Sequence, residues 1–171
     1  MAAKAPKGYK GIGMDGVIAT WYARNTRKSI EEYRKDAQKV AERLSGGEEI
    51  LELAPGPGYL SIELAKLGNF RITGLDISET FVEIARKNAR EAGVNIDFRC
   101  GDASRMPFEE NAFDFIVCRA AFKNFSRPVT ALNEMHRVLK SGGRALILDL
   151  RGDVSREAVE KHVREDLGLS G

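Results

Sequence analysis

Cysteine, histidine and long apolar runs are scarce in this 171-residue sequence, and each scarcity excludes a class of structure or site. The two cysteines, Cys100 and Cys118, give neither a disulfide framework nor the spacing of metal ligands, so no metal site is predicted. Both lie in apolar, strand-like runs, which predicts buried and reduced thiols. The two histidines do not suggest a base: we expect His136 to be structural and His162 to be solvated.

No apolar run reaches the roughly 18 residues that span a bilayer, and the N-terminus lacks the apolar core of a signal peptide. We therefore expect no membrane segment and a reducing, cytoplasmic location. The net charge of +2 at pH 7 is too small to imply nucleic acid as a partner. The hydrophobic fraction of 43% and the charged fraction of 30% are typical of a soluble globular chain of one domain.

The centre of the predicted fold is the stretch from Glu49 to Ala65. A short apolar run breaks at Ala54-Pro55-Gly56-Pro57-Gly58, and a mostly buried helix pattern follows. The pattern predicts a strand, a tight glycine turn and a helix. Because Gly56 and Gly58 lack side chains, a ligand can lie against the backbone, and the first helical turn offers unpaired N–H groups. Glu52 places a carboxylate at the mouth of this turn.

Helices and strands alternate along the rest of the chain. Ser29 and Glu32 form a capping-box pattern, Ser78 is a natural N-cap, and Ser141-Gly142-Gly143 predicts a turn. Helices are predicted at 30–44, from the glycine turn to about 68, at 79–92, 128–139 and 155–167, and strands at 49–53, 71–75, 95–100, 113–118 and 144–150. Five strands that alternate with helices predict an α/β fold, a parallel sheet covered on both faces.

The first 28 residues look irregular, because glycines at 8, 11, 13 and 16 break any pattern. They are also basic, which could steer an anionic substrate. Ile18, Trp21 and Tyr22 are too apolar for a free tail, so we expect a partly ordered lid, with a flexible solvated segment as the alternative. The main domain is then predicted at 29–171.

Charged residues lie at the carboxyl ends of four of the predicted strands: Glu52, Asp76, Asp102 and Arg119. In parallel sheets ligands bind beyond the carboxyl ends of the strands, which is where these residues fall. Three of them also have a structural alternative. Asp76 could cap the next helix, Asp102 could be an ordinary turn residue, and Arg119 could be a surface ion-pair partner.

Five segments together resemble one family. ILELAPGPGYLSIELAKLG, GLDIS, CGDASRMPF, FDFIVCRAAFKNF and EMHRVLKSGGRALILDL are similar to the motifs of the class I S-adenosylmethionine-dependent methyltransferases, over residues 33–150. The resemblance implies a Rossmann-like doubly wound sheet with strand order 3-2-1-4-5, and S-adenosyl-L-methionine as the cofactor, leaving S-adenosyl-L-homocysteine as product.

The resemblance also implies roles for individual residues. Glu52 and the turn after it match the family's acidic, glycine-rich cradle for the methionine half. Asp76 matches the residue that accepts both ribose hydroxyls, because a carboxylate has two oxygens. Asp102 matches the acid near the adenine amino group, and Arg119 lies where the family's chain passes the sulfonium. The implied cofactor-binding residues are Tyr22, which would close over the cofactor, Glu52, Ala54, Gly56, Gly58, Asp76, Ile77, Asp102, Ala103 and Arg119.

Two departures from the family pattern stand out. Ala54 occupies a position where the family usually has glycine, and its Cβ would weaken binding if the residue were left-handed. We expect binding to survive, since Gly56 and Gly58 remain. The sequence also ends before the family's last two strands, so the apolar edge at 145–148 is expected to self-associate, directly or through the last helix, or to be covered by a refolded C-terminus.

The implied reaction is an in-line methyl transfer, in which the protein supplies alignment and desolvation. No catalytic base is evident. The Cys118-Arg119-Ala120-Ala121 sequence replaces the Asn-Pro-Pro-Tyr motif of base-methylating enzymes, so a small-molecule acceptor is expected. A nicotinamide oxidoreductase would need a glycine near Ser61. The alternative from another class is a non-catalytic protein that binds S-adenosylmethionine or its demethylated product, or that serves as an assembly partner.

Overall fold

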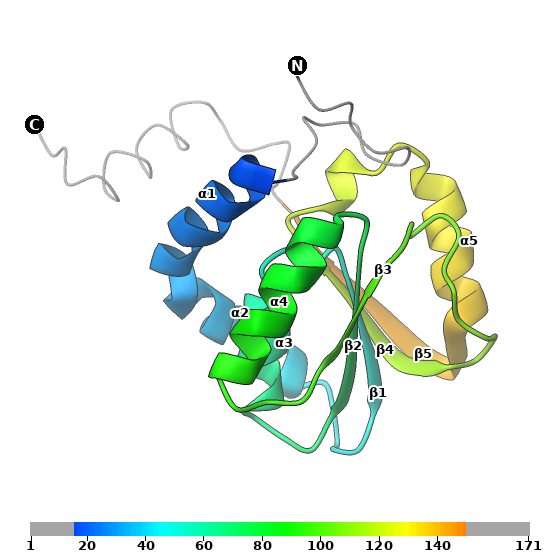
Figure 1. Ribbon diagram of the computed structural model, residues 1–171. Coiled ribbons are helices and arrows are strands. Elements are labelled where there is room, and N and C mark those ends of the chain that lie inside the picture. Colours follow the sequence, from blue (N-terminus) through cyan, green and yellow to red (C-terminus); the bar gives the residue numbers. More distant parts are fainter. Residues whose placement is uncertain (1–15, 150–171) are drawn as a thin grey trace, which may run out of the picture.

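The computed structural model describes residues 16–149, which form a five-stranded parallel sheet in the order β3-β2-β1-β4-β5 (Figure 1). The predicted α/β fold and its strand order are confirmed. The strands are β1 Glu49–Leu53, β2 Arg71–Asp76, β3 Asp97–Cys100, β4 Phe113–Arg119 and β5 Leu139–Leu148. The helices are α1 Gly16–Thr26, α2 Ile30–Ala41, α3 Tyr59–Ala65, α4 Glu79–Glu91 and α5 Pro128–Val138, with short 3₁₀ turns η1 Arg27–Ser29 and η2 Phe122–Asn124.

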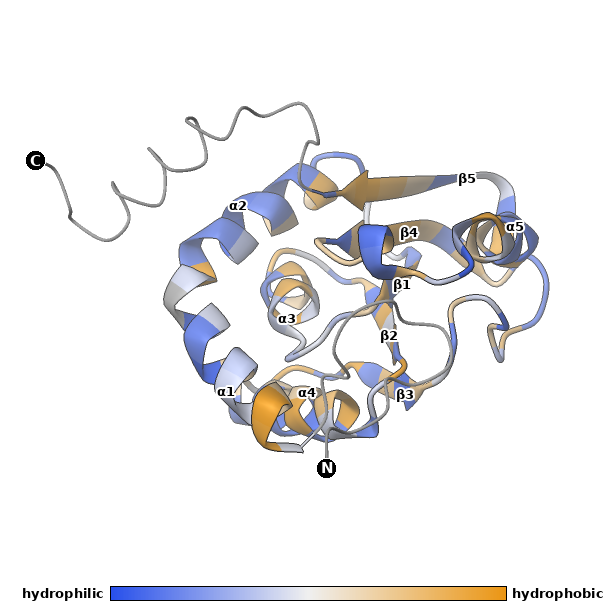
Figure 2. Ribbon diagram, turned by 90° about the horizontal axis from the view of Figure 1, so that it is seen from above, coloured by the Kyte–Doolittle hydropathy of each residue, from blue (hydrophilic) through white to orange (hydrophobic). Residues whose placement is uncertain are grey.

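Helices cover both faces of the sheet, as Figures 1 and 2 show. Neighbouring residues of β1 point to opposite faces: Ile50 packs with α2 and α3, whereas Leu51 packs with α5. A third cluster joins α3 and α4 to Phe98 of β3. Because β1 lies in the middle of the sheet, the turn that follows it reaches the centre of the carboxyl edge.

The N-terminal segment is more regular than the sequence predicted. Gly16 has a positive φ of 59°, and the ten residues after it contain neither glycine nor proline, so α1 can form. Ala19 and Ala23, one turn apart, are buried on its inner face. The prediction of an irregular segment up to residue 28 was therefore wrong from Gly16 onward, and residues 1–15 lie outside the described part.

The predicted capping box at Ser29 is absent. Because η1 runs directly into α2, Ser29 makes no side-chain cap hydrogen bond. Glu32, the other half of the box, instead lies 3.5 Å from the guanidinium of Arg119. At α4 the prediction holds, since the Ser78 hydroxyl accepts a hydrogen bond from the Phe81 N–H at 3.3 Å.

Strand β5 begins five residues earlier than predicted. Its register against β4 jumps between the pairs Phe113–Leu139 and Phe115–Arg144, so the predicted turn at Ser141-Gly142-Gly143 forms an irregularity inside the strand. Ile147 on this strand is 37% exposed. The predicted helix at 155–167 lies outside the described residues, so the expected self-association through this edge or that helix stays a prediction.

One of the two cysteines differs from expectation. Cys118, on β4 inside the sheet, is buried as predicted, and burial raises its pKa to about 12. Cys100 is exposed, so that prediction was wrong. It ends the edge strand β3, on which only Phe98 is buried. Among the helices of residues 16–149, none is long and apolar enough to cross a membrane.

Candidate functional site

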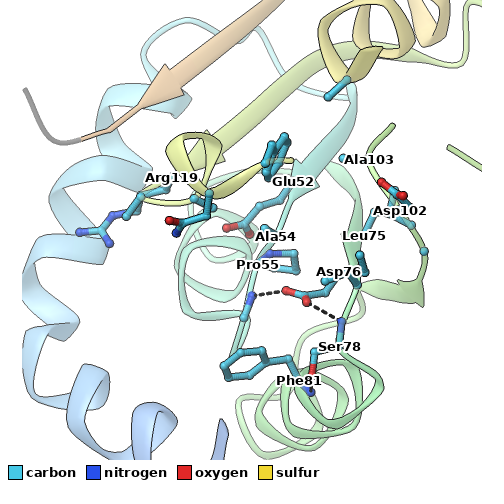
Figure 3. A pocket seen from close by; sticks show the side chains of 18 of the residues that line it. Glu52, Ala54, Pro55, Leu75, Asp76, Ser78, Phe81, Asp102, Ala103 and Arg119 are labelled. Atoms are coloured by element: carbon cyan, nitrogen blue, oxygen red, sulfur yellow. Dashed lines mark hydrogen bonds between the residues drawn. The ribbon is translucent and has the colours of Figure 1, made fainter. Parts of the chain in front are cut away.

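A cavity of about 310 Å³ opens at the carboxyl edge of the sheet (Figure 3). Its size is at the lower end of the ~300–1,000 Å³ that small-ligand sites span. Nine of the ten predicted site residues line it: Tyr22, Glu52, Ala54, Gly56, Asp76, Ile77, Asp102, Ala103 and Arg119. The residues chosen from the sequence come together because each lies near the carboxyl end of a strand, just after one, or in the N-terminal segment.

Gly58 is the exception. It does not line the cavity but has a φ of 80° directly before α3. A Cβ at this position would lie 2.8 Å from the ring of Phe98 and 3.0 Å from the Cβ of Ala85. Glycine is thus required there for backbone conformation and for the close packing of the turn against α4 and β3, not for room beside a ligand.

Ala54 adopts the left-handed conformation in which its Cβ was expected to weaken ligand binding. Its φ is 54°, in the left-handed region, while its N–H donates to the carbonyl of Leu75 on β2 at 2.8 Å. A left-handed alanine costs roughly 1–2 kcal/mol relative to ordinary backbone. The hydrogen bond to β2 helps to hold the residue in place, so the turn keeps its shape despite the missing glycine.

Glu52 is buried, with 3% of its surface exposed, at the end of β1. Its carboxylate accepts hydrogen bonds from the Ser61 N–H at 3.0 Å and from the Ser61 hydroxyl. Burial, opposed by these hydrogen bonds, raises the pKa of Glu52 to about 7. The Ser61 hydroxyl on α3 is therefore a hydrogen-bond partner of the buried Glu52 side chain.

Asp76 is also buried and joins two parts of the pocket. One carboxylate oxygen accepts from the Gly56 N–H at 2.9 Å, and the other accepts from the Ser78 N–H at 2.9 Å (Figure 3). The residue thus links the glycine turn to the start of α4. The simple helix-cap alternative for Asp76 describes only half of this arrangement, because the Gly56 contact spans 20 residues of sequence.

Asp102 lies on the loop after β3. Although partial burial would raise its pKa, hydrogen bonds from the Ser104 hydroxyl at 2.6 Å and the Ser104 N–H at 2.8 Å, together with the charge of Arg127, hold the pKa below its ordinary value. The Arg127 guanidinium donates to the other carboxylate oxygen at 3.1 Å. Asp102 is therefore an ionised acceptor at the rim of the cavity.

Arg119 contributes to the cavity, but its guanidinium turns toward α2 (Figure 3). Its Nε donates to Asp36 at 2.7 Å, and its guanidinium carbon lies 4.2 Å from the centre of the Tyr33 ring. The alternative of a surface ion pair is correct for the pairing but wrong for the position. With only 17% of its side chain exposed, it is not a surface pair.

Several lining residues were not identified from the sequence. Tyr33 on α2 and Phe81 on α4 are two of them, and no sequence signal separates a residue that faces the core from one that faces a cavity. Tyr22 stands at an angle to Phe81, with ring centroids 5.9 Å apart, so α1 and α4 meet at the pocket. Nothing in the sequence marks Arg127, whose role depends on the position of Asp102.

Comparison with known proteins agrees with this geometry. Residues 51–147 match the family model described as a methyltransferase domain. The demethylmenaquinone methyltransferase of Chlorobaculum tepidum is 36% identical over 127 residues, which cover 73% of this chain and 50% of that protein. UbiE, a ubiquinone/menaquinone biosynthesis C-methyltransferase of Blochmanniella pennsylvanica, is 40% identical over 104 residues, which cover 58% of this chain and 41% of that protein. The chain thus spans about half the length of these curated relatives.

A solved structure matches over a greater length. A Methanococcus maripaludis protein assigned as an S-adenosyl-L-methionine-dependent methyltransferase aligns with a TM-score of 0.78 and 28% identity, over 100% of this chain and 90% of that one. The family model covers the glycine turn, the strands that carry the acidic residues, and almost all of β5. This chain therefore belongs to the methyltransferase-domain family.

Proposed function

We propose that this protein binds S-adenosyl-L-methionine in the cavity at the carboxyl edge of the sheet and transfers its methyl group to a small molecule. The observation that carries the proposal is the position of Asp76, whose carboxylate sits between the glycine turn and the start of α4. A carboxylate so placed faces the cavity beside two backbone segments, an arrangement suited to a ribose with two adjacent hydroxyls.

The other acids extend this arrangement along the cavity. Glu52, beside the glycine turn, is the anchor for the methionine half, and Asp102 is the acceptor for the adenine amino group, with Ile77 and Ala103 beside the ring. Tyr22 supports the proposed lid role of the N-terminal segment, because it lines the cavity from α1. This division places a polar anchor at each end and in the middle of an elongated ligand.

Bound S-adenosyl-L-methionine supplies a methyl group already activated on a sulfonium. The chain's own residues then hold the two ends and exclude water with Tyr33, Phe81 and Phe125. Transfer would move the methyl carbon from sulfur to the acceptor's nucleophilic atom and leave S-adenosyl-L-homocysteine, and the proton that the acceptor loses would pass to solvent. Turning the Arg119 cation toward Asp36 and Glu32 also keeps an unpaired positive charge away from the sulfonium.

A quinone-type aromatic ring is the first acceptor class to test, since the curated relatives are named for menaquinone and ubiquinone synthesis. The protein is incubated with S-adenosylmethionine labelled on the methyl group and a reduced demethylated quinone. Transfer of label to the organic phase supports the proposal. Saturable binding of the cofactor without transfer to any small-molecule acceptor supports the non-catalytic alternative, and failure to bind overturns both.

A further inference from the structure

Three of the large apolar side chains that residues 16–149 leave exposed are gathered at the start of α1. Val17 is 85% exposed, Ile18 43% and Trp21 63%. Val17 and Trp21 are one helical turn apart, with Ile18 beside them, so the three form one continuous surface, here termed the α1 apolar face. Figure 2 shows the first turn of α1 as strongly hydrophobic. The other four exposed apolar residues are spread over three regions: Leu67, Val129, Leu132 and Ile147.

The opposite side of α1 packs against the domain, so the α1 apolar face is not the side of the helix that contacts the core. The carbonyl of Ala23 accepts a hydrogen bond from the hydroxyl of Tyr59 at 2.9 Å, and the Gly16 N–H donates to the Thr80 hydroxyl at 3.2 Å. Tyr22 contacts Phe81 and lines the cavity. The helix is therefore fixed by one side and presents Trp21 outward on the other.

The charged residues of α1 and of the 3₁₀ turn after it are all basic. The α1 sequence contains no acidic residue. Arg24 and Arg27 follow the apolar residues and are exposed, and neither forms a salt bridge within residues 16–149. An apolar surface bordered by unpaired cations is complementary to a surface in which a layer of negative charges lies over a layer of apolar chains.

We propose that the α1 apolar face docks on a lipid bilayer that carries anionic headgroups. Trp21 would lie in the interfacial layer, where its amphipathic ring is favoured, with Arg24 and Arg27 at the level of the lipid phosphates. Tyr22 is the neighbour of Trp21 on the same helix. Docking would therefore place the cavity within about one helix diameter, roughly 10 Å, of the bilayer surface. An apolar acceptor could then reach the cavity directly from the membrane.

Trp21 is the only tryptophan of the chain, which makes its fluorescence a direct reporter. The full-length protein is titrated with vesicles of phosphatidylcholine, with and without phosphatidylglycerol, while Trp21 emission and co-sedimentation are followed. We expect a shift to shorter wavelength and co-sedimentation with the anionic vesicles, weaker by on the order of tenfold for the zwitterionic ones. Added salt should reduce the difference.

Paired variants locate the contact. Val17→Ser with Ile18→Ser keeps the reporter and should reduce vesicle binding, whereas Val129→Ser with Leu132→Ser, on α5, should leave it unchanged. Circular dichroism confirms that both variants fold. Absence of a spectral shift at saturating lipid overturns the proposal. A shift that grows with protein concentration in the absence of lipid also overturns it, because it identifies a second copy of the chain as the occupant.

Discussion

Arg119, at the carboxyl end of β4, and Asp36, on α2, form an ion pair at 2.7 Å that ties the N-terminal helices to the pocket edge. The two side chains are 17% and 16% exposed, and they are 83 residues apart in the sequence. The ring of Tyr33, which lines the cavity, packs against the guanidinium of Arg119. The position of one wall of the pocket therefore depends on this pair.

Replacing Arg119 with methionine should destabilise the fold by about 2 kcal/mol, because a mostly buried carboxylate loses its main partner. The matched control is Lys39→Met, which removes the exposed partner of the same carboxylate, 2.9 Å away, and should change stability by no more than about 0.5 kcal/mol. Urea denaturation measures both. Equal losses of stability in the two variants would show that the buried ion pair contributes no more to stability than the exposed one.

The stability of the protein should depend on the protonation of Glu52. Burial raises its pKa from an ordinary value of 4.5 to about 7, so the folded state holds a proton that the unfolded state releases. This contribution is complete below pH 4.5 and is lost as the pH rises to about 7. Its full size is about 3 kcal/mol at 1.36 kcal/mol for each pKa unit.

Urea denaturation between pH 4.5 and 8 tests this dependence by comparing the wild type with Glu52→Gln. The glutamine oxygen can still accept from the Ser61 N–H but does not titrate in this range. The wild type should lose stability relative to the variant as the pH rises. Parallel curves for the two proteins would mean that Glu52 is ionised throughout.

Comparing alanine substitutions at two glycines with positive φ separates the energetic cost of backbone strain from the cost of a packing clash. Gly58→Ala should cost about 3 kcal/mol, since the added Cβ meets Phe98 at 2.8 Å in addition to the strain of a φ of 80°. Gly93→Ala, with a φ of 69° and no atom within 4 Å of the new Cβ, should cost only about 1 kcal/mol. Thermal denaturation measures the difference. A smaller loss at Gly58 than at Gly93 would refute the packing argument.

Ala54→Gly should stabilise the protein by up to about 1 kcal/mol. Glycine relieves the left-handed strain at a φ of 54°, although it also gives the unfolded chain more freedom. Ala41→Gly, at the end of the ordinary helix α2, is the control and should destabilise by roughly 0.5–1 kcal/mol. If both substitutions destabilise equally, the strain assigned to Ala54 is absent.

The sequence predicted the parts of this fold that depend on local periodicity. The alternation of strands and helices located all five strands within a few residues, apart from the early start of β5, and the carboxyl ends of those strands brought Glu52, Asp76 and Asp102 to one cavity. The parts that depend on distant partners were not predictable. The Arg119 guanidinium binds α2 because Asp36 is there, and Cys100 is exposed because its strand lies at the edge. Gly58 was placed in the site by its motif, whereas its surroundings show a packing role.

The central claim is that the cavity holds S-adenosyl-L-methionine on the carboxylates of the first three strands, and Asp76 tests it most directly. Isothermal titration with S-adenosylhomocysteine compares the wild type with Asp76→Asn and with Asp97→Asn, an exposed aspartate that begins β3 and pairs with Arg99. We predict saturable binding by the wild type, equal binding by Asp97→Asn, and at least roughly tenfold weaker binding by Asp76→Asn, about 1.4 kcal/mol. Binding by a folded Asp76→Asn as tight as that of the wild type would contradict the account.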